Sequence, residues 1–169
     1  VYDITKYGEE NLVIIRQKGD ILGLIWTITG QYRGLVYSAI SPTTVFHISG
    51  DMFRKYLQDN PRAALPVVDM LAEMYRVHSD RIRTLEYRSV RERLVSFLYN
   101  HAKRFGRQTP DGILIDVPLR HQDIASSISA SRETTSRELA ALERLGYLTN
   151  EHLMITVKDR DKLHAAFLE

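Results

Sequence analysis

The sequence predicts an α+β protein in which a short-stranded β-domain is followed by one long helix and then by a compact helical unit with a β-hairpin. Three observations carry this prediction. Short runs of β-branched and aromatic residues fill residues 1–50. From Pro66 to about Tyr87 there is no further proline or glycine, and apolar residues recur at helical spacing. Residues 89–169 mix helical and strand patterns.

The composition sets limits on function. The 169 residues, 44% of them hydrophobic, can form one or two cores. The 23 Lys and Arg against 21 Asp and Glu give a net charge of +2, so nucleic-acid binding would depend on local placement of charge. The absence of cysteine excludes disulfides, thiolate zinc sites and cysteine nucleophiles within this chain. With no signal peptide and no apolar run near the ~20 residues of a membrane span, we expect a cytoplasmic protein without membrane contact.

Residues 1–60 are expected to form the first domain. The runs 1–4, 11–17, 33–40 and 43–48 have the residues typical of strands, and glycine-containing or polar turns separate them. Short strands at this spacing indicate a sandwich or a barrel.

Residues 61–88 are expected to form a dimerisation helix and a hinge. Apolar residues recur there at steps of three and four, as at the seam of a coiled coil. The seam residues are Val68, Leu71, Tyr75, His78, Ile82 and Leu85. A second apolar stripe that includes Met70 and Met74 can face the β-domain, so one helix can serve its own domain and a second copy at once. A buried helix within a monomer is the alternative.

Residues 89–169 have the pattern of a winged helix-turn-helix domain. The expected segments are a helix that ends at Gly106, a strand over 113–119, a short helix over 121–129, a helix capped by Ser131, a hairpin with its turn at 150–152, and a closing helix capped by Asp159. Helix, tight break, helix and hairpin is the order of that fold. The side chains that it would bury include Ile124, Ile128, Leu139, Leu142 and Leu145.

The helix that follows Ser131 has a charged front. Arg132, Glu133 and Arg137 project together from it, while leucines occupy the rear. Arginine can bind guanine O6 and N7, and glutamate can accept from cytosine N4, so we predict that these three residues contact base edges. The hydroxyls of Ser131 and Thr134 and the free N–H groups of the helix start can bind phosphates. The alternative is a solvated helix start with an ordinary i,i+4 pair between Glu133 and Arg137.

With these residues the chain resembles the Crp/Fnr family of bacterial transcription regulators, over essentially its whole length. "SRETTSREL" looks like the recognition-helix signature of that family, "RERLVSFLYNHAKRFG" like the helix after its hinge, and "KGDILG" like the Gly-Asp-x-x-Gly turn of its sensor barrel. The resemblance begins partway into a cyclic-nucleotide-binding-like jelly-roll barrel, whose opening strands have no counterpart here.

The resemblance implies a homodimer bound to double-stranded DNA. Its long helices would pack together, and two recognition helices about 34 Å apart would enter successive major grooves of a palindrome with TGTGA-like halves. RNA polymerase is a further implied partner. Ser129 stands where family members often have glycine, and Arg120 stands where many have a Thr or Ser cap. Arg120, His121 and Gln122 would then contact phosphates.

The resemblance also places an effector pocket at Gly23, Leu24, Arg33, Gly34, His78 and Ser79. Cyclic-AMP-binding members have a ribose-binding glutamate at the position of Leu24 and a phosphate-binding serine at that of Gly34, whereas Arg33 is kept. Because leucine cannot accept a hydrogen bond from a ribose hydroxyl, cyclic AMP is a doubtful effector and the cofactor stays unknown. His78 would face its twin across the seam, either packed and neutral or as a sensor of pH or ligand.

Neither an enzyme nor a metal site is expected. The six histidines form no HExxH pair, and the sequence lacks a Walker loop, GxSxG and GxGxxG. The remaining alternative is a ligand-sensing interaction module whose helix-turn-helix contacts a protein. The front formed by Arg132, Glu133 and Arg137 favours DNA instead, since it has no aromatic residue or leucine. The sequence therefore predicts a homodimeric, sequence-specific transcription regulator with a modified sensor domain.

Overall fold

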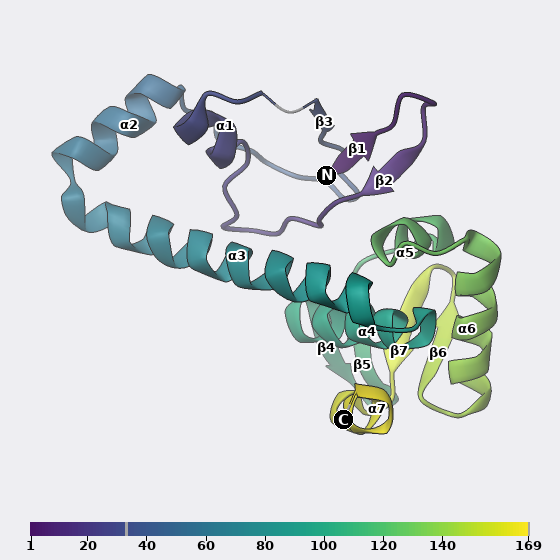
Figure 1. Ribbon diagram of the computed structural model, residues 1–169. Helices are drawn as coiled ribbons and strands as arrows, with labels where there is room; N and C mark the ends of the chain where they lie inside the picture. The colour runs from purple at the N-terminus through teal and green to yellow at the C-terminus, as the bar shows by residue number, and fades with distance from the viewer. Residues whose placement is uncertain (33, 169) are drawn as a thin grey trace.

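The computed structural model describes residues 1–32 and 34–168. Figure 1 shows an N-terminal lobe of short strands and helices, one long helix that runs alongside it, and a C-terminal lobe at the far end of that helix. Both lobes contain an antiparallel sheet, which confirms the α+β fold class.

The N-terminal lobe contains a small sheet with short helices beside it. Its elements are β1 (Tyr2–Ile4), β2 (Glu10–Leu12), α1 (Leu24–Thr29), β3 (Leu35–Val36), α2 (Gly50–Asp59) and the 3₁₀ helix η1 (Pro61–Ala63). The strand order is β2-β1-β3, and Tyr2 pairs with Leu12 on one side and with Val36 on the other. Among the described residues this sheet stays open and does not close into a barrel.

Several predicted strands of this lobe were too long or wrong. The run 11–17 is a strand only as far as Leu12, and 33–40 contributes only Leu35–Val36, with Arg33 outside the described residues. Residues 43–48 form irregular chain, and the side chain of Phe46 is 96% exposed there. Strand formers need a neighbouring strand to pair with, and none of the described strands pairs with this segment.

Two helices of this lobe were missed. The helix α1 carries apolar and β-branched residues that resemble a strand, but it begins after Gly23, whose positive φ of 71° turns the chain. The helix α2 has an N-cap that the sequence does show, because the Ser49 hydroxyl accepts from the Met52 amide at 3.3 Å.

The long helix α3 (Ala64–Tyr87) confirms the helix prediction and both of its apolar stripes. On one stripe Met74 is partly covered, with its sulfur 3.9 Å from Arg16 Nη1 of the N-terminal lobe. Arg81 also donates from α3 to the Val13 carbonyl at 3.0 Å. On the other stripe Tyr75 is 76% exposed, and Val68 and Ile82 are exposed as well. One face of α3 thus packs on its own lobe, while three seam residues face solvent and the other three, Leu71, His78 and Leu85, are half-buried.

The C-terminal lobe is a winged helix-turn-helix domain, as predicted. Its elements are α4 (Val90–Phe105), β4 (Gly106–Thr109), β5 (Gly112–Ile115), α5 (His121–Ser127), α6 (Arg132–Arg144), β6 (Leu148–Glu151), β7 (Met154–Val157) and α7 (Arg160–Leu168). The antiparallel sheet has the order β4-β5-β7-β6. Its core includes Leu94, Leu98, Ile124, Ile128, Leu139, Leu142 and Leu163.

Local sequence explains where the elements of this lobe begin and end. Ser89 and Glu92 form a reciprocal capping box at the start of α4. The backbone leaves the helix at Gly106, where it is extended, and glycine is required there because a Cβ would collide with the Ala102 carbonyl oxygen and the Ile113 side chain. Asp159 caps α7, since its Oδ1 accepts from the amides of Asp161 and Lys162.

Four details of this lobe differ from the prediction. The strand predicted over 113–119 is shorter, since β5 ends at Ile115. The strand β4 was missed because its residues Gly106–Thr109 are mostly polar and exposed. The hairpin turn is His152–Leu153 rather than 150–152, since those two residues adopt the positive φ values, 50° and 68°, that a two-residue loop needs. Leu145, the C-cap residue of α6, is 59% exposed and not buried.

Candidate nucleic-acid interface

One face of the helix α6 packs into the core of the C-terminal lobe, and its opposite face, called its front, is exposed. Its N-cap Ser131 accepts from the Thr134 amide at 3.1 Å, which confirms the predicted cap. The buried hydroxyl of Thr135 donates to the Ser131 carbonyl at 2.9 Å, and Leu139 and Leu142 are fully buried. These contacts fix the N-terminal turn of the helix against the lobe.

The three side chains predicted to contact bases all lie on the free front of α6. Arg132, Glu133 and Arg137 are exposed. Within the described part of the chain, Glu133 and Arg137 do not form an ion pair. The alternative of an ordinary i,i+4 pair between these two residues is therefore not present in the structure. Hydrogen bonds from the Glu133 amide and from Ser131 hold the pKa of the Glu133 carboxyl below its usual range. The front therefore presents two positive groups and one negative group at neutral pH.

His121 connects three elements of the domain. Its Nδ1 lies 2.7 Å from Ser136 Oγ on α6, and its Nε2 lies 2.9 Å from the side-chain nitrogen of Asn150 on β6. Because the amide nitrogen of Asn150 is a donor, Nε2 accepts and the Nδ1 hydrogen goes to Ser136. The sequence had suggested His121 only as a phosphate contact, and it gave no sign of Ser136 or Asn150.

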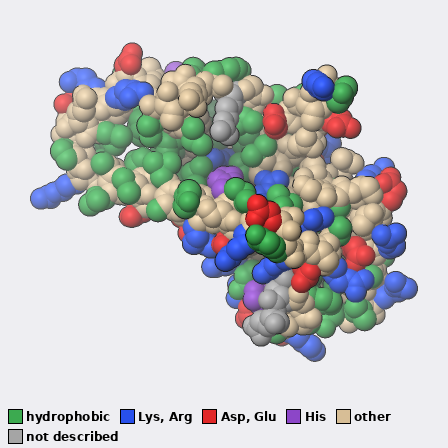
Figure 2. Space-filling model, in the orientation of Figure 1, with side chains coloured by type: hydrophobic (Ala, Val, Ile, Leu, Met, Phe, Trp, Pro, Cys, Tyr) green, Lys and Arg blue, Asp and Glu red, His purple; other side chains and the backbone are tan. Residues whose placement is uncertain are grey.

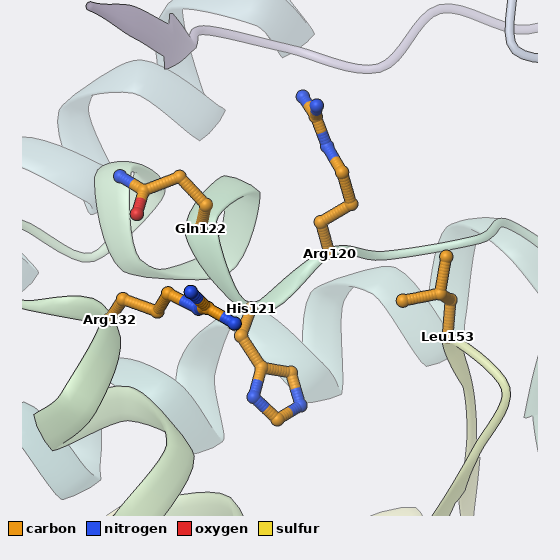
Figure 3. A pocket seen from close by; sticks show the side chains of 5 residues that line it. All are labelled: Arg120, His121, Gln122, Arg132 and Leu153. Atoms are coloured by element: carbon orange, nitrogen blue, oxygen red, sulfur yellow. The ribbon is translucent and has the colours of Figure 1, made fainter.

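Arg120, at the N-cap position of α5, is held by carboxylates. Its guanidinium makes two contacts of 2.8 Å with the buried Asp123 and one of 3.4 Å with Glu10 of the N-terminal lobe. Asp123, the nearer carboxylate, raises the pKa of Arg120 the most. In Figure 3 the side chain extends away from His121 and Arg132, toward the N-terminal ribbon. The predicted phosphate contact is thus engaged within the protein.

A cleft of about 510 Å³ lies where α5, α6 and the hairpin meet. It is lined by Arg120, His121, Gln122, Arg132 and Leu153 (Figure 3). Leu153 belongs to the hairpin turn, and Gln122 is exposed. Among the other predicted phosphate contacts, Ser131 donates to the Thr134 hydroxyl at 3.1 Å. Polar donors from two helices therefore surround one open surface, as phosphate binding requires.

The predicted effector residues lie on separate elements. Gly23 and Leu24 begin α1, and Leu24 is buried. His78 and Ser79 are half-buried within α3, and Gly34 is exposed. Arg33 lies outside the described residues.

Over the described part of the chain, no group of three or more histidine or acidic residues is suited to hold a metal ion. None of the described helices is long and apolar enough to cross a membrane.

The fold and the site define a DNA-binding class of protein, a winged helix-turn-helix joined by a long helix to a β-containing lobe. The Crp-like helix-turn-helix domain family matches residues 92–166. The global nitrogen regulator of Synechococcus elongatus is 32% identical over 156 residues, which cover 91% of this chain and 70% of that protein. The chain belongs to the Crp/Fnr family of transcription regulators.

Two further proteins show how far the likeness extends. The cAMP-activated global transcriptional regulator CRP of Salmonella typhimurium is 30% identical over 138 residues, covering 80% of this chain and 65% of that protein. A transcriptional regulator of the CRP/FNR family from Thermus thermophilus shares the fold, with a TM-score of 0.63 at 19% identity, over 99% of this chain and 82% of that one.

Proposed function

We propose that this chain is a sequence-specific DNA-binding regulator that contacts base edges through Arg132, Glu133 and Arg137. The observation that carries the proposal is the charged, exposed front of α6, which is backed by the buried Leu139 and Leu142. A rigid helix with free donors and one acceptor at its N-terminal end suits the major groove, which presents a distinct pattern for each base pair. Ser131, Thr134 and Gln122 would contact phosphates around it, as would Arg120 with the donors that Asp123 leaves free, whereas both ring nitrogens of His121 are engaged within the domain.

We further propose three functional units: a sensor over 1–60, a dimerisation helix and hinge over 61–88, and a DNA-binding domain over 89–169. The break at Arg88 supports the second boundary, since its backbone is extended between α3 and α4 (φ −110°, ψ 146°). The exposed seam of α3 supports a homodimer. Two copies related by a two-fold axis would suit a palindromic operator, and RNA polymerase would be the next partner.

Control by an effector in the sensor is part of the proposal. The Salmonella relative is cAMP-activated by name, whereas here Leu24 is buried and Gly34 offers no side chain. We therefore propose an effector other than cyclic AMP.

A protein-binding role for α6 gains no support from the surface. Hydrophobic side chains gather on the N-terminal lobe, and charged side chains are spread over the C-terminal lobe (Figure 2).

Selection of bound sequences from a random duplex pool, at fixed salt and with or without cyclic AMP, tests the proposal. We expect enrichment of a palindrome with TGTGA-like halves, and we expect cyclic AMP to change nothing. Failure to enrich any sequence in either condition would count against DNA binding. Enrichment only with cyclic AMP would retain the DNA-binding role and reject the argument from Leu24 and Gly34.

A further inference from the structure

The N-terminal lobe docks directly on α5, the first helix of the helix-turn-helix. In Figure 1 the strand β2 lies beside this helix. β2 is an edge strand of its sheet. The amide and the carbonyl of Leu12 both bond to serine hydroxyls of α5. The Leu12 amide donates to Ser126 Oγ at 3.1 Å, and Ser127 Oγ donates to the Leu12 carbonyl at 3.3 Å. The Leu12 side chain is only 5% exposed.

An ion pair adds to this contact at the start of α5. Glu10 Oε2 lies 3.4 Å from Arg120 Nη2, and the guanidinium carbon lies 6.0 Å from the ring centre of Tyr2. Both charged side chains remain about half exposed, so the pair alone contributes little. Its importance is positional, because it occupies the arginine that is proposed to contact phosphate.

The docked hairpin also forms a wall of the DNA-facing surface. A cleft of about 860 Å³ has Glu9, Glu10 and Asn11 on the side of the hairpin. The facing residues are Arg120, Gln122, Ala125, Ser126, Ser129, Ala130 and Ser131. Arg120, Gln122 and Ser131 are three of the proposed phosphate contacts. A DNA strand that approached them would meet two carboxylates, and duplex DNA carries one negative charge per ~1.7 Å of its axis.

We propose that the β1–β2 hairpin is an inhibitory latch on the helix-turn-helix. While β2 is docked on α5, Glu10 occupies Arg120 and the acidic wall repels the DNA backbone. Undocking removes the wall and the Glu10 contact, so that Arg120, still paired with Asp123 through Nε and Nη2, can turn its remaining N–H donors to a phosphate. The inference rests on the proposed DNA-binding function and names the regulation of that same site.

The chain after the hairpin gives the latch a connection to both long helices. Arg81 of α3 donates to the Val13 carbonyl at 3.0 Å, and Arg104 of α4 lies 2.6 Å from Asp20. A movement of α3 against α4 would therefore pull on the segment 13–20, which follows β2. This supplies a route by which a change in the sensor or in the dimer can open the latch.

The docking itself is tested without DNA, by amide hydrogen exchange at Leu12 in the full chain. We expect Glu10→Gln to speed this exchange about two- to fivefold, the range for the loss of one exposed ion pair. Glu9→Gln is the matched control, because it removes the same charge from the same hairpin without a partner on Arg120 among the described contacts. In an Arg120→Gln background, Glu10→Gln should have no effect. Exchange that Glu10→Gln leaves unchanged would overturn the latch.

The effect of the docked hairpin on DNA binding is tested by titrating the same variants into a labelled duplex that carries a palindrome of TGTGA-like halves. We expect Glu10→Gln to bind about two- to fivefold more tightly than Glu9→Gln at the same salt. Equal gains in both variants would show general charge repulsion and overturn the inhibitory role of the pair. If no variant bound any duplex, the DNA-binding function would fail, while the exchange at Leu12 would still decide whether the hairpin docks through Glu10.

Discussion

The Nδ1 atom of His121 lies 2.7 Å from the Oγ atom of Ser136, so the imidazole at the start of α5 is joined to α6, the second helix of the helix-turn-helix. The opposite ring nitrogen lies 2.9 Å from the Asn150 amide nitrogen on β6. One side chain therefore sets the spacing of both helices and the wing. A residue in this position helps to shape the proposed nucleic-acid interface without itself needing to contact DNA.

We expect His121→Ala to lower the free energy of unfolding by about 1–3 kcal/mol, because two hydrogen bonds of ~0.5–1.5 kcal/mol each are lost. Urea denaturation measures this change. Gln122→Ala is the control, since Gln122 is exposed and none of the described residues bonds to its side chain. It should stay within about 0.5 kcal/mol of the parent protein. Equal effects of the two substitutions would show that His121 does not order the domain.

The arginines of the α6 front should determine specificity. Arg132→Ala and Arg137→Ala should each weaken binding to the preferred duplex by ~1–3 kcal/mol and relax selection at one base pair. Arg144→Ala, at the far end of the same helix, removes the same charge from an exposed position and should leave the selected sequence unchanged. Binding titrations against a set of single-base variants of the site provide the measurement. Uniform weakening on all duplexes would mean that these arginines contact phosphates only.

The seam of α3 should control assembly. Tyr75→Asp places a carboxylate in the middle of the exposed stripe, where a second copy would bury it unpaired, so we expect the dimer dissociation constant to rise at least about tenfold. Tyr87→Asp makes the same chemical change on another face of α3, at a side chain that is 81% exposed. It should leave assembly unchanged. Sedimentation equilibrium distinguishes the two, and an identical monomer fraction in both would place the dimer interface elsewhere.

The predictable part of this fold is the part that local rules dictate. Caps at Ser131 and Asp159, the glycine that ends α4, and the apolar stripes of α3 are short-range features, and all of them are present. The strands of the N-terminal lobe depend on distant partners. A β-branched run such as 43–48 becomes a strand only if another strand pairs with it, and sequence pattern alone does not supply that pairing.

The same distinction holds for the site. The exposure of Arg132, Glu133 and Arg137 follows from the periodicity of one helix, so it was predicted. The bonds of His121 join residues that lie 15 and 29 positions apart in the chain, and Glu10 meets Arg120 across 110 positions. Neither has a local signal. The contact between Glu10 and Arg120 could therefore be found only from the folded structure.

A last prediction concerns acid. The His101 ring stacks on Phe97 at 3.8 Å between ring centres, and its Nδ1 lies 2.8 Å from the Phe97 carbonyl oxygen. Burial is the main cause that lowers the pKa of His101, the hydrogen bond to the Phe97 carbonyl opposes it, and with the positive charges of Arg104 and Arg81 the net pKa is about 4. The unfolded chain should titrate near ~6.5. Between these values the unfolded state binds a proton that the folded state excludes.

The contribution of His101 to the free energy of unfolding is therefore fully present above about pH 6.5. It is lost as the pH falls toward 4, by up to ~1.4 kcal/mol per pH unit. Urea denaturation of the parent protein and of His101→Phe from about pH 7 to pH 4.5 measures this contribution. Phenylalanine keeps a ring against Phe97 but has no proton to gain, so its free energy of unfolding should fall less steeply. Equal slopes would mean that His101 becomes charged within the folded lobe, and its stacking on Phe97 would then not exclude the cation.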